Sequence, residues 1–148
     1  MADDTAVLLK VYEEQWAQAR QHENQRVAIT NILLIIAPAI VGFISQQGLR
    51  PQMLPLTILL SVVGIFGIVA CAKLSEAADF HLERARFLHK RLDELHPDAH
   101  LAKLREEADS KHKAAFPRME RLRVYQLWLV LHIAIALVGV ALTLIVIF

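Results

Sequence analysis

Three long apolar stretches interrupt an otherwise polar chain of 148 residues: Val27–Ile44, Met53–Ala72 and Val124–Phe148. None of them contains Asp, Glu, Lys or Arg, and His132 is the one histidine among them. A bilayer core about 30 Å thick is crossed by roughly 20 helical residues. The pattern therefore predicts three transmembrane helices, over residues 27–45, 53–73 and 124–148.

The polar segments carry apolar residues at spacings of three and four, which is the period of an amphipathic helix. After the second span these positions are Leu74, Ala78, Leu82, Ala85, Leu88, Leu92 and Leu95. In the N-terminal segment they are Leu8, Val11, Tyr12, Trp16 and Ala19. Pro97 ends the helix that follows the second span, and Asp98 is expected to cap the next one. The stripe on that next helix is weaker and comprises Leu101, Leu104 and Ala108.

These polar helices have similar lengths, so they can cover one another below the membrane. At 1.5 Å per residue, residues 4–26, 74–95 and 99–123 each extend about 30–37 Å. We expect a single all-α membrane domain over residues 1–148. In it, the three spans continue into a cytoplasmic three-helix stalk, built from residues 4–26 and the helical hairpin 74–123, that buries its apolar stripes.

Charge predicts the orientation of this domain. Of the sixteen Lys and Arg residues, three precede the first span, twelve lie between Lys73 and Arg123, and Arg50 alone lies in the link between the first two spans. Basic residues favour the cytoplasmic side of a membrane. The N-terminus and the stalk are therefore predicted in the cytoplasm and Phe148 on the far side. The first 26 residues are polar and partly acidic, so the first span is expected to direct insertion without a cleaved signal peptide.

Small or polar residues recur along one face of each span at spacings of three and four, the pattern by which membrane helices approach closely. In the first span they are Asn31, Ile35, Pro38, Gly42 and Ser45. In the second they are Thr57, Ser61, Gly64, Ile68 and Cys71, with Gly67 beside them, and in the third His132, Ala136, Gly139 and Thr143. These faces either hold the bundle together or, in an oligomer, line a water-filled path.

His132 bears most directly on that choice, because ionisable groups inside a membrane are costly and face a partner or a cavity. It lies about two turns inside Arg123, and Asn31 lies at a similar depth inside Arg26. A neutral His132 bonded to Asn31 would be a packing residue. A His132 facing a water-filled axis would instead gain a proton and gate ions.

Several residues are predicted at the cytoplasmic membrane interface. Tyr125 and Trp128 fit an aromatic belt, and Glu23 can pair with Arg26 one turn later. Contacts with anionic lipid headgroups are expected from Arg118, Arg121 and Arg123. These residues are interpreted as anchors.

The remaining chemistry of the chain is sparse. A net charge of +1 argues against nucleic acid as a partner, and one cysteine excludes an intramolecular disulfide. His96-x-Asp98-x-His100 is interpreted as a solvated turn, because a zinc site needs three or four converging ligands. The other histidines outside the spans, His22, His81, His89 and His112, are expected to face solvent. No cofactor, metal or catalytic constellation is predicted, so an enzyme is not expected.

The entry to the first span reads Tyr12-Glu13-Glu14-Gln15-Trp16, then His22-Glu23-x-x-Arg26-x-x-x-x-Asn31. This resembles small bacterial inner-membrane proteins of two groups, the octameric RipA-type family and the SLATT-type effectors of nucleotide-sensing antiphage systems. The resemblance covers about the first third of the chain, and the third span departs from the two-span SLATT pattern. It implies a bacterial inner-membrane homo-oligomer with a periplasmic C-terminus whose cytoplasmic helices sense a protein or small-molecule trigger.

Two functions follow as hypotheses. The first is a homo-oligomer, in contact with lipid and with itself, that forms or gates a pore or perturbs the membrane, as a defence effector would. The alternative is a non-conducting scaffold that assembles or anchors a partner through its cytoplasmic helices.

Overall fold

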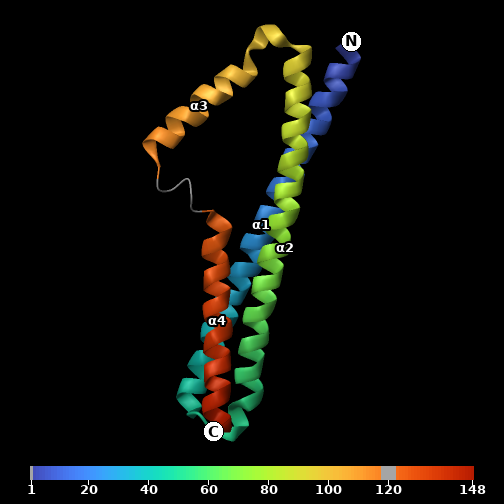
Figure 1. The fold of residues 1–148 in the computed structure, drawn as a ribbon. Helices are drawn as coiled ribbons and strands as arrows, with labels where there is room; N and C mark the ends of the chain where they lie inside the picture. Colours follow the sequence, from blue (N-terminus) through green and yellow to red (C-terminus); the bar gives the residue numbers. More distant parts are fainter. Residues whose placement is uncertain (1, 118–122) are drawn as a thin grey trace. The chain divides into compact units, whose positions relative to one another are not determined.

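The computed structural model describes residues 2–117 and 123–148, and the regular structure within them is entirely helical (Figure 1). Two very long helices come first: α1 spans Ala2–Gln47 and α2 spans Leu54–Leu95. Short 3-10 turns, η1 at Pro51–Met53 and η2 at Pro97–Ala99, precede α2 and α3. Helix α3 covers Leu101–Ala115, and α4 covers Val124–Ile147. The all-α prediction is confirmed, and α1 and α2 each run without a break from the polar into the apolar sequence.

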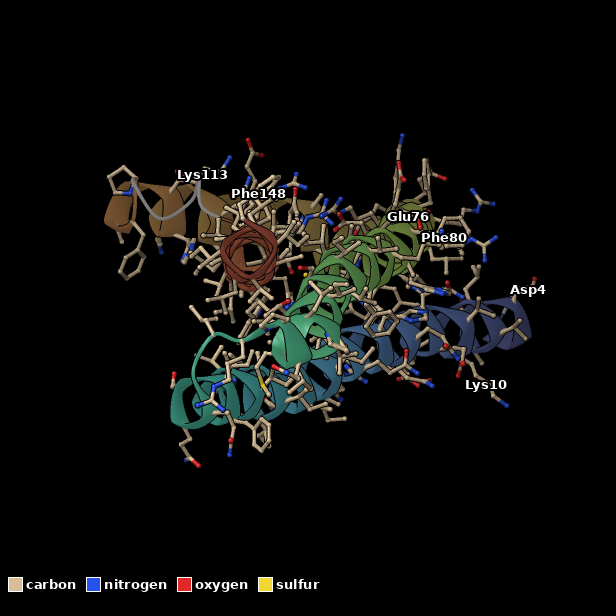
Figure 2. The ribbon with its side chains drawn as sticks, turned by 90° about the horizontal axis from the view of Figure 1, so that it is seen from below. Asp4, Lys10, Glu76, Phe80, Lys113 and Phe148 are labelled. Carbon is tan, nitrogen blue, oxygen red and sulfur yellow. The ribbon has the colours of Figure 1, made fainter. Side chains whose placement is uncertain are left out.

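The helices contribute to two compact units. We call Asn24–Ser75 with Val124–Phe148 the apolar unit, and Met1–Glu23 with Glu76–Arg123 the polar unit. In the apolar unit, α1, α2 and α4 lie side by side (Figure 1). In the polar unit, α1 and α2 lie side by side and α3 follows the turn at η2. Figure 2 shows Lys10 on α1 projecting away from α2, as expected for a solvated face.

The core of the apolar unit comes from one face of each helix. Its central cluster joins α1 to α2 through Ala37, Ile40, Ile44 and Leu60. The residues that α1 buries recur at spacings of three and four: Thr30, Leu33, Ala37, Ile40 and Ile44. This face lies one residue away from the predicted stripe of small residues on the first span. Since consecutive helical residues differ by about 100° in direction, the inward face of α1 is rotated from the predicted one.

Helices α2 and α4 approach each other very closely. A Cβ added at Gly64 would lie 2.6 Å from Ala136 Cα, and one added at Gly139 would lie 2.6 Å from Ser61 Oγ. At Gly67 the added atom would overlap the imidazole of His132, 2.7 Å from Cγ. Only glycine fits at these three positions without movement of the neighbouring helix. The small residues of α2 and α4 therefore meet each other within one protein chain.

In the polar unit, α1 and α2 pack through small side chains. Ala19, Ala78 and Ala85 are buried at this contact, and Leu92 extends it toward the end of α2. Tyr12 is half-buried, while Trp16 remains exposed. Alanine allows the two backbones to come close, and this contact accounts for the regular spacing of apolar residues that the sequence shows.

Helix α3 does not bury its apolar stripe. No residue of α3 is buried, and Leu104 and Phe116 are 59% and 53% exposed. The prediction that Leu101, Leu104 and Ala108 pack into the stalk is wrong in this respect. Two leucines and an alanine over fifteen residues offer little apolar area, so burying them would stabilise the packing only weakly.

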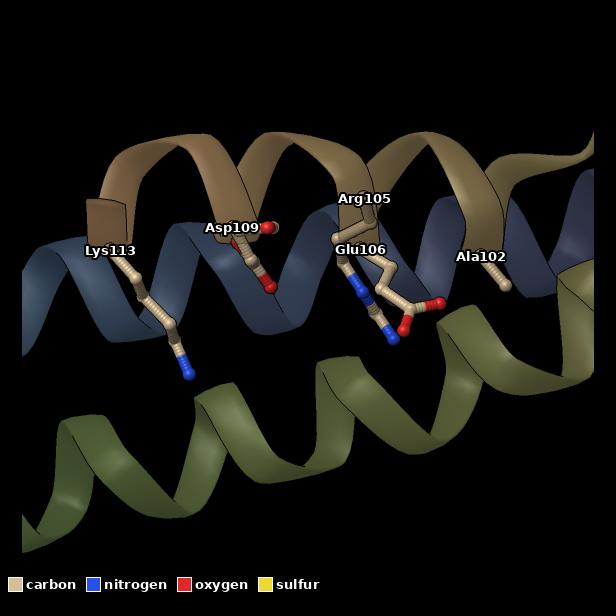
Figure 3. Close-up of a pocket in the computed structure, with 6 residues that line it drawn as sticks. Ala102, Arg105, Glu106, Asp109 and Lys113 are labelled. Atoms are coloured by element: carbon tan, nitrogen blue, oxygen red, sulfur yellow. The ribbon is translucent and has the colours of Figure 1, made fainter. Parts of the chain in front are cut away.

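The start of α3 also differs from the prediction. Its N-cap residue is His100, in the left-handed conformation with φ of 49°, and no side chain caps the helix. Asp98, the predicted cap, lies in the first turn of η2. Toward α1 and α2 the helix presents charged side chains, including Arg105, Asp109 and Lys113 (Figure 3). The stripe and the cap were thus both misassigned.

Candidate functional site in the apolar unit

The most unusual group in the apolar unit is His132, whose side chain is completely buried on α4. Its Nε2 lies 3.2 Å from Thr30 Oγ1 on α1, and its ring packs against Gly67 on α2. Its Nδ1 has no hydrogen-bond partner among the described residues. The ring therefore contacts all three helices. The predicted partner was Asn31, which is exposed; Thr30, one residue earlier, takes its place.

Arg26 occupies a second buried polar position, with 9% of the residue exposed. Its Nη1 donates to Ser75 Oγ on α2 at 2.9 Å, whereas its Nε has no hydrogen-bond partner within the described part of the chain. Arg26 also acts electrostatically on the buried Cys71, whose thiol makes a 3.8 Å contact to the carbonyl of Tyr125. The sequence suggested a surface pair with Glu23, but Arg26 instead points into the helix contact.

The other predicted polar residues of the spans bond to their own helices. Thr57 donates to the carbonyl of Leu54 at 3.0 Å, and Ser61 donates to that of Thr57 at 3.1 Å. Thr143 donates to the carbonyl of Gly139 at 2.8 Å. Such bonds to the preceding turn satisfy a hydroxyl without water or a partner helix. These residues therefore have no structural need for an aqueous path.

The small-residue face of α1 has a different environment. Asn31, Pro38 and Ser45 are exposed, and no heavy atom lies within 4 Å of a Cβ added at Gly42. Ile35, in the same row, is 72% exposed. Of the three small-residue faces seen in the sequence, those on α2 and α4 meet inside the chain, and the one on α1 points outward. We call the residues Asn31, Ile35, Pro38, Gly42 and Ser45 the outer face of α1.

The predicted interface residues occupy varied positions. Tyr125 and Trp128 are half-buried, and the indole Nε1 of Trp128 is a buried donor without a partner in the described structure. Arg123 is exposed, 3.8 Å from the carboxylate of Asp79, and Glu23 is exposed. The two further predicted residues, Arg118 and Arg121, lie outside the described residues.

Three histidines that were expected in solvent are half-buried in the polar unit. The rings of His22 and His81 stack at 5.4 Å between centroids, and His81 Nδ1 lies 2.8 Å from Gln15 Oε1. His89 packs beside Tyr12 with ring centroids 5.8 Å apart. The signal was available in the spacing, because Gln15 and His22 are seven residues apart on one helix face. Within the described residues, no three metal-binding side chains come together.

No protein-family model, curated protein or solved structure matches the chain. The class of protein therefore follows from its own features. Three of its helices, α1, α2 and α4, contain stretches long and apolar enough to cross a membrane, judged by length and composition. Within those stretches, only 22%, 28% and 17% of the residues are buried inside the chain. The protein is a helical bundle that leaves most of its apolar surface uncovered.

Proposed function

We propose that this chain is an integral membrane protein with three spans, a cytoplasmic N-terminus and a C-terminus on the far side. The support comes from the uncovered apolar surface of α1, α2 and α4 and from the unequal distribution of basic residues. At about 25 cal/mol per Å² of apolar area, leaving side chains such as Ile35, Val69 and Leu137 in water would be strongly unfavourable. A lipid environment removes that cost. The polar unit then forms the cytoplasmic stalk.

The outer face of α1 carries the next step of the proposal. In lipid, the side chain of Asn31 would have no hydrogen-bond partner, and Gly42 would have no neighbour to pack against. Membrane helices associate through small residues and through amides that bond across the contact. Copies of the protein therefore associate through the outer face of α1, and this homo-oligomer forms or gates a path for ions along its axis.

In this arrangement His132 and Arg26 form contacts between helices of one protomer and do not line the axis of the oligomer. Each links helices of one protomer: His132 joins α4 to α1, and Arg26 joins α1 to α2. Their role in the proposal is to fix the rotation of α1, and so to determine which of its residues face a neighbouring copy. Of the polar residues that the sequence offered on the three spans, Asn31 and Ser45 on the first are therefore the pore candidates of this proposal.

A non-conducting scaffold is the second candidate function, and one observation favours it. Thr57, Ser61 and Thr143 are each satisfied within their own helix, so the described structure contains few polar groups that require a water-filled path. In that case helix α3, which has no buried residue, would be the surface offered to a partner.

Oligomeric state and ion flux together test the proposal. The purified protein would be placed in nanodiscs for mass measurement and in liposomes for flux. The variant Asn31→Leu should reduce both assembly and flux. The matched control is Ile32→Leu, at the next residue. Ile32 is also exposed, but it is apolar and lies outside the outer face of α1, so this change should alter neither assembly nor flux.

The possible results separate the two functions. A wild-type protein that is monomeric in nanodiscs overturns the oligomer and the pore together. A stable oligomer in liposomes that stay sealed supports the scaffold. Equal loss of assembly in Asn31→Leu and Ile32→Leu would show that the outer face of α1 is not the contact.

A further inference from the structure

The polar unit contains a cavity of about 460 Å³ between α1, α2 and α3. This volume falls in the range of about 300–1,000 Å³ that is typical of small-molecule sites. Its lining includes Tyr12, Trp16, Arg86, His89, Arg105 and Asp109. A second hollow, lined by α3 alone, shares Arg105 and Asp109 with it (Figure 3).

One wall of the cavity is aromatic. The rings of Tyr12 and Trp16 on α1 are 6.3 Å apart and nearly perpendicular, and the imidazole of His89 on α2 lies 5.8 Å from Tyr12. Trp16 is exposed although it sits between helices. An exposed indole on a cavity wall offers a planar face on which another ring can stack.

The other walls carry positive charge. Arg86 on α2 and Arg105 on α3 both line the cavity, and neither forms an ion pair with another described residue. Guanidinium groups bind phosphate and carboxylate through two parallel hydrogen bonds. In the same region, the Nε2 of His89 is buried and lacks a hydrogen-bond partner among the described residues. The two guanidinium groups therefore line the cavity without an acceptor among the described residues, whereas His89 Nε2 lies 3.8 Å from the carboxylate of Asp93.

Asp109 is the one carboxylate among the described residues that line the cavity. It disfavours a ligand that is anionic all round, and it can accept hydrogen bonds from a ligand that also carries amino or hydroxyl donors. A ligand between α3 and the other two helices would supply the contacts that α3 lacks in the free protein.

We propose that the cavity between α1, α2 and α3 binds a small anion that carries a planar ring. The ring stacks on Trp16, and the anionic group, a phosphate or a carboxylate, bonds to Arg86 and Arg105. Binding joins α3 to the α1–α2 pair. The site is independent of the proposed pore, because every residue in it belongs to the polar unit.

Binding to the full-length protein in nanodiscs tests this site directly. AMP and indole-3-acetate are the probes, since they share a ring and an anionic group but carry phosphate and carboxylate respectively. Adenosine and ribose 5-phosphate are the matched ligands that lack one of the two features. The chain has two tryptophans, so in a Trp128→Phe background the fluorescence of Trp16 reports binding of AMP, adenosine and ribose 5-phosphate at the cavity. Calorimetry measures the affinity of indole-3-acetate, whose own indole fluoresces like tryptophan, and the affinity of every ligand for the variants in which Trp16 is changed.

We expect at least one of AMP and indole-3-acetate to bind, and adenosine and ribose 5-phosphate to bind at least about tenfold more weakly. Arg86→Gln and Arg105→Gln should each weaken binding about tenfold. Trp16→Ala should weaken it about fivefold or more, and Trp16→Phe should retain part of the affinity. The matched control is Arg84→Gln, which removes the same charge from α2 where the guanidinium covers the ring of Phe80.

Two results overturn the inference, in protein whose circular dichroism shows the helices intact. One is the failure of both ring-bearing anions to bind more tightly than about 1 mM. The other is an equal loss of affinity in Arg84→Gln and Arg86→Gln, which would indicate general charge attraction. Both measurements are made without ion flux, so neither result bears on the proposed pore.

Discussion

The close approach of α2 and α4 leads to a quantitative prediction for Gly64→Ala. The new methyl group would lie 2.6 Å from Ala136 Cα and 2.7 Å from its Cβ. An ordinary contact between carbon atoms is about 3.5–4.0 Å, so the two helices must separate locally by about 1 Å. A gap of that size forfeits about a quarter to a half of the dispersion energy of the neighbouring contacts. The strain therefore extends to the contacts made by Gly67 and Gly139.

Overpacking of this kind costs about 1–3 kcal/mol, while exchanging glycine for alanine within a helix returns up to about 1 kcal/mol. We expect a net loss of about 1–2 kcal/mol in the free energy of unfolding. Unfolding by SDS in mixed micelles, followed by tryptophan fluorescence, measures it. The control is Gly42→Ala, where nothing lies within 4 Å, and the protomer should be unchanged or slightly more stable. A Gly64→Ala protein that unfolds at the wild-type SDS fraction, or above it, would refute the close packing.

Four further predictions concern the buried polar contacts and the orientation. Thr30→Val keeps the side-chain volume and should destabilise the apolar unit by about 0.6 kcal/mol, the average for a hydrogen bond between membrane helices; SDS unfolding measures it, and a Thr30→Val protein as stable as the wild type would contradict the bond to His132. His132→Gln should keep assembly largely intact and His132→Leu should lower stability, because only glutamine can still bond to Thr30; equal stability of the two would remove the bond's structural role. Arg26→Ala should be more destabilising than Ser75→Ala in the same assay, since arginine loses its aliphatic packing as well as its donors; the reverse order would contradict the burial of Arg26. Reporter fusions at Phe148 should indicate a location outside the cytoplasm, and a cytoplasmic signal would contradict the three-span proposal.

The sequence predicted the helices well because long apolar runs and a period of three and four are strong signals. The ends of α2 and α4 fall close to the predicted boundaries. The sequence did not predict which face of α1 packs against the other helices. The stripe with Asn31 and Pro38 and the stripe with Thr30 and Ala37 differ by one residue, and both have helical spacing. Composition alone does not tell which face meets the protein's own helices and which one is left for another molecule.

The misjudged histidines have a related cause. Imidazole is both planar and polar, so it fits a helix contact as well as a solvated surface, and residue type did not separate these cases for His22 and His81. Their positions relative to Gln15 would have been more informative. For α3, a periodic stripe of two leucines and an alanine resembled a packing face. Its apolar area was too small for burial to hold α3 against the other helices. Period indicates a helix, whereas the amount of apolar area decides whether that helix packs.

The glycine-lined contact between α2 and α4 also has a consequence for how the protein is made. Gly64 emerges from the ribosome about 70 residues before Ala136, which is several seconds at about 5–20 residues per second. During that interval α1 and α2 are already present, and the glycine face of α2 has no partner from its own chain. A newly made protein is therefore open to pairing with α4 of another molecule, or with an unrelated small-residue helix. Slower synthesis of the segment that links α2 to α4 would lengthen this interval and increase the fraction of misassembled protein.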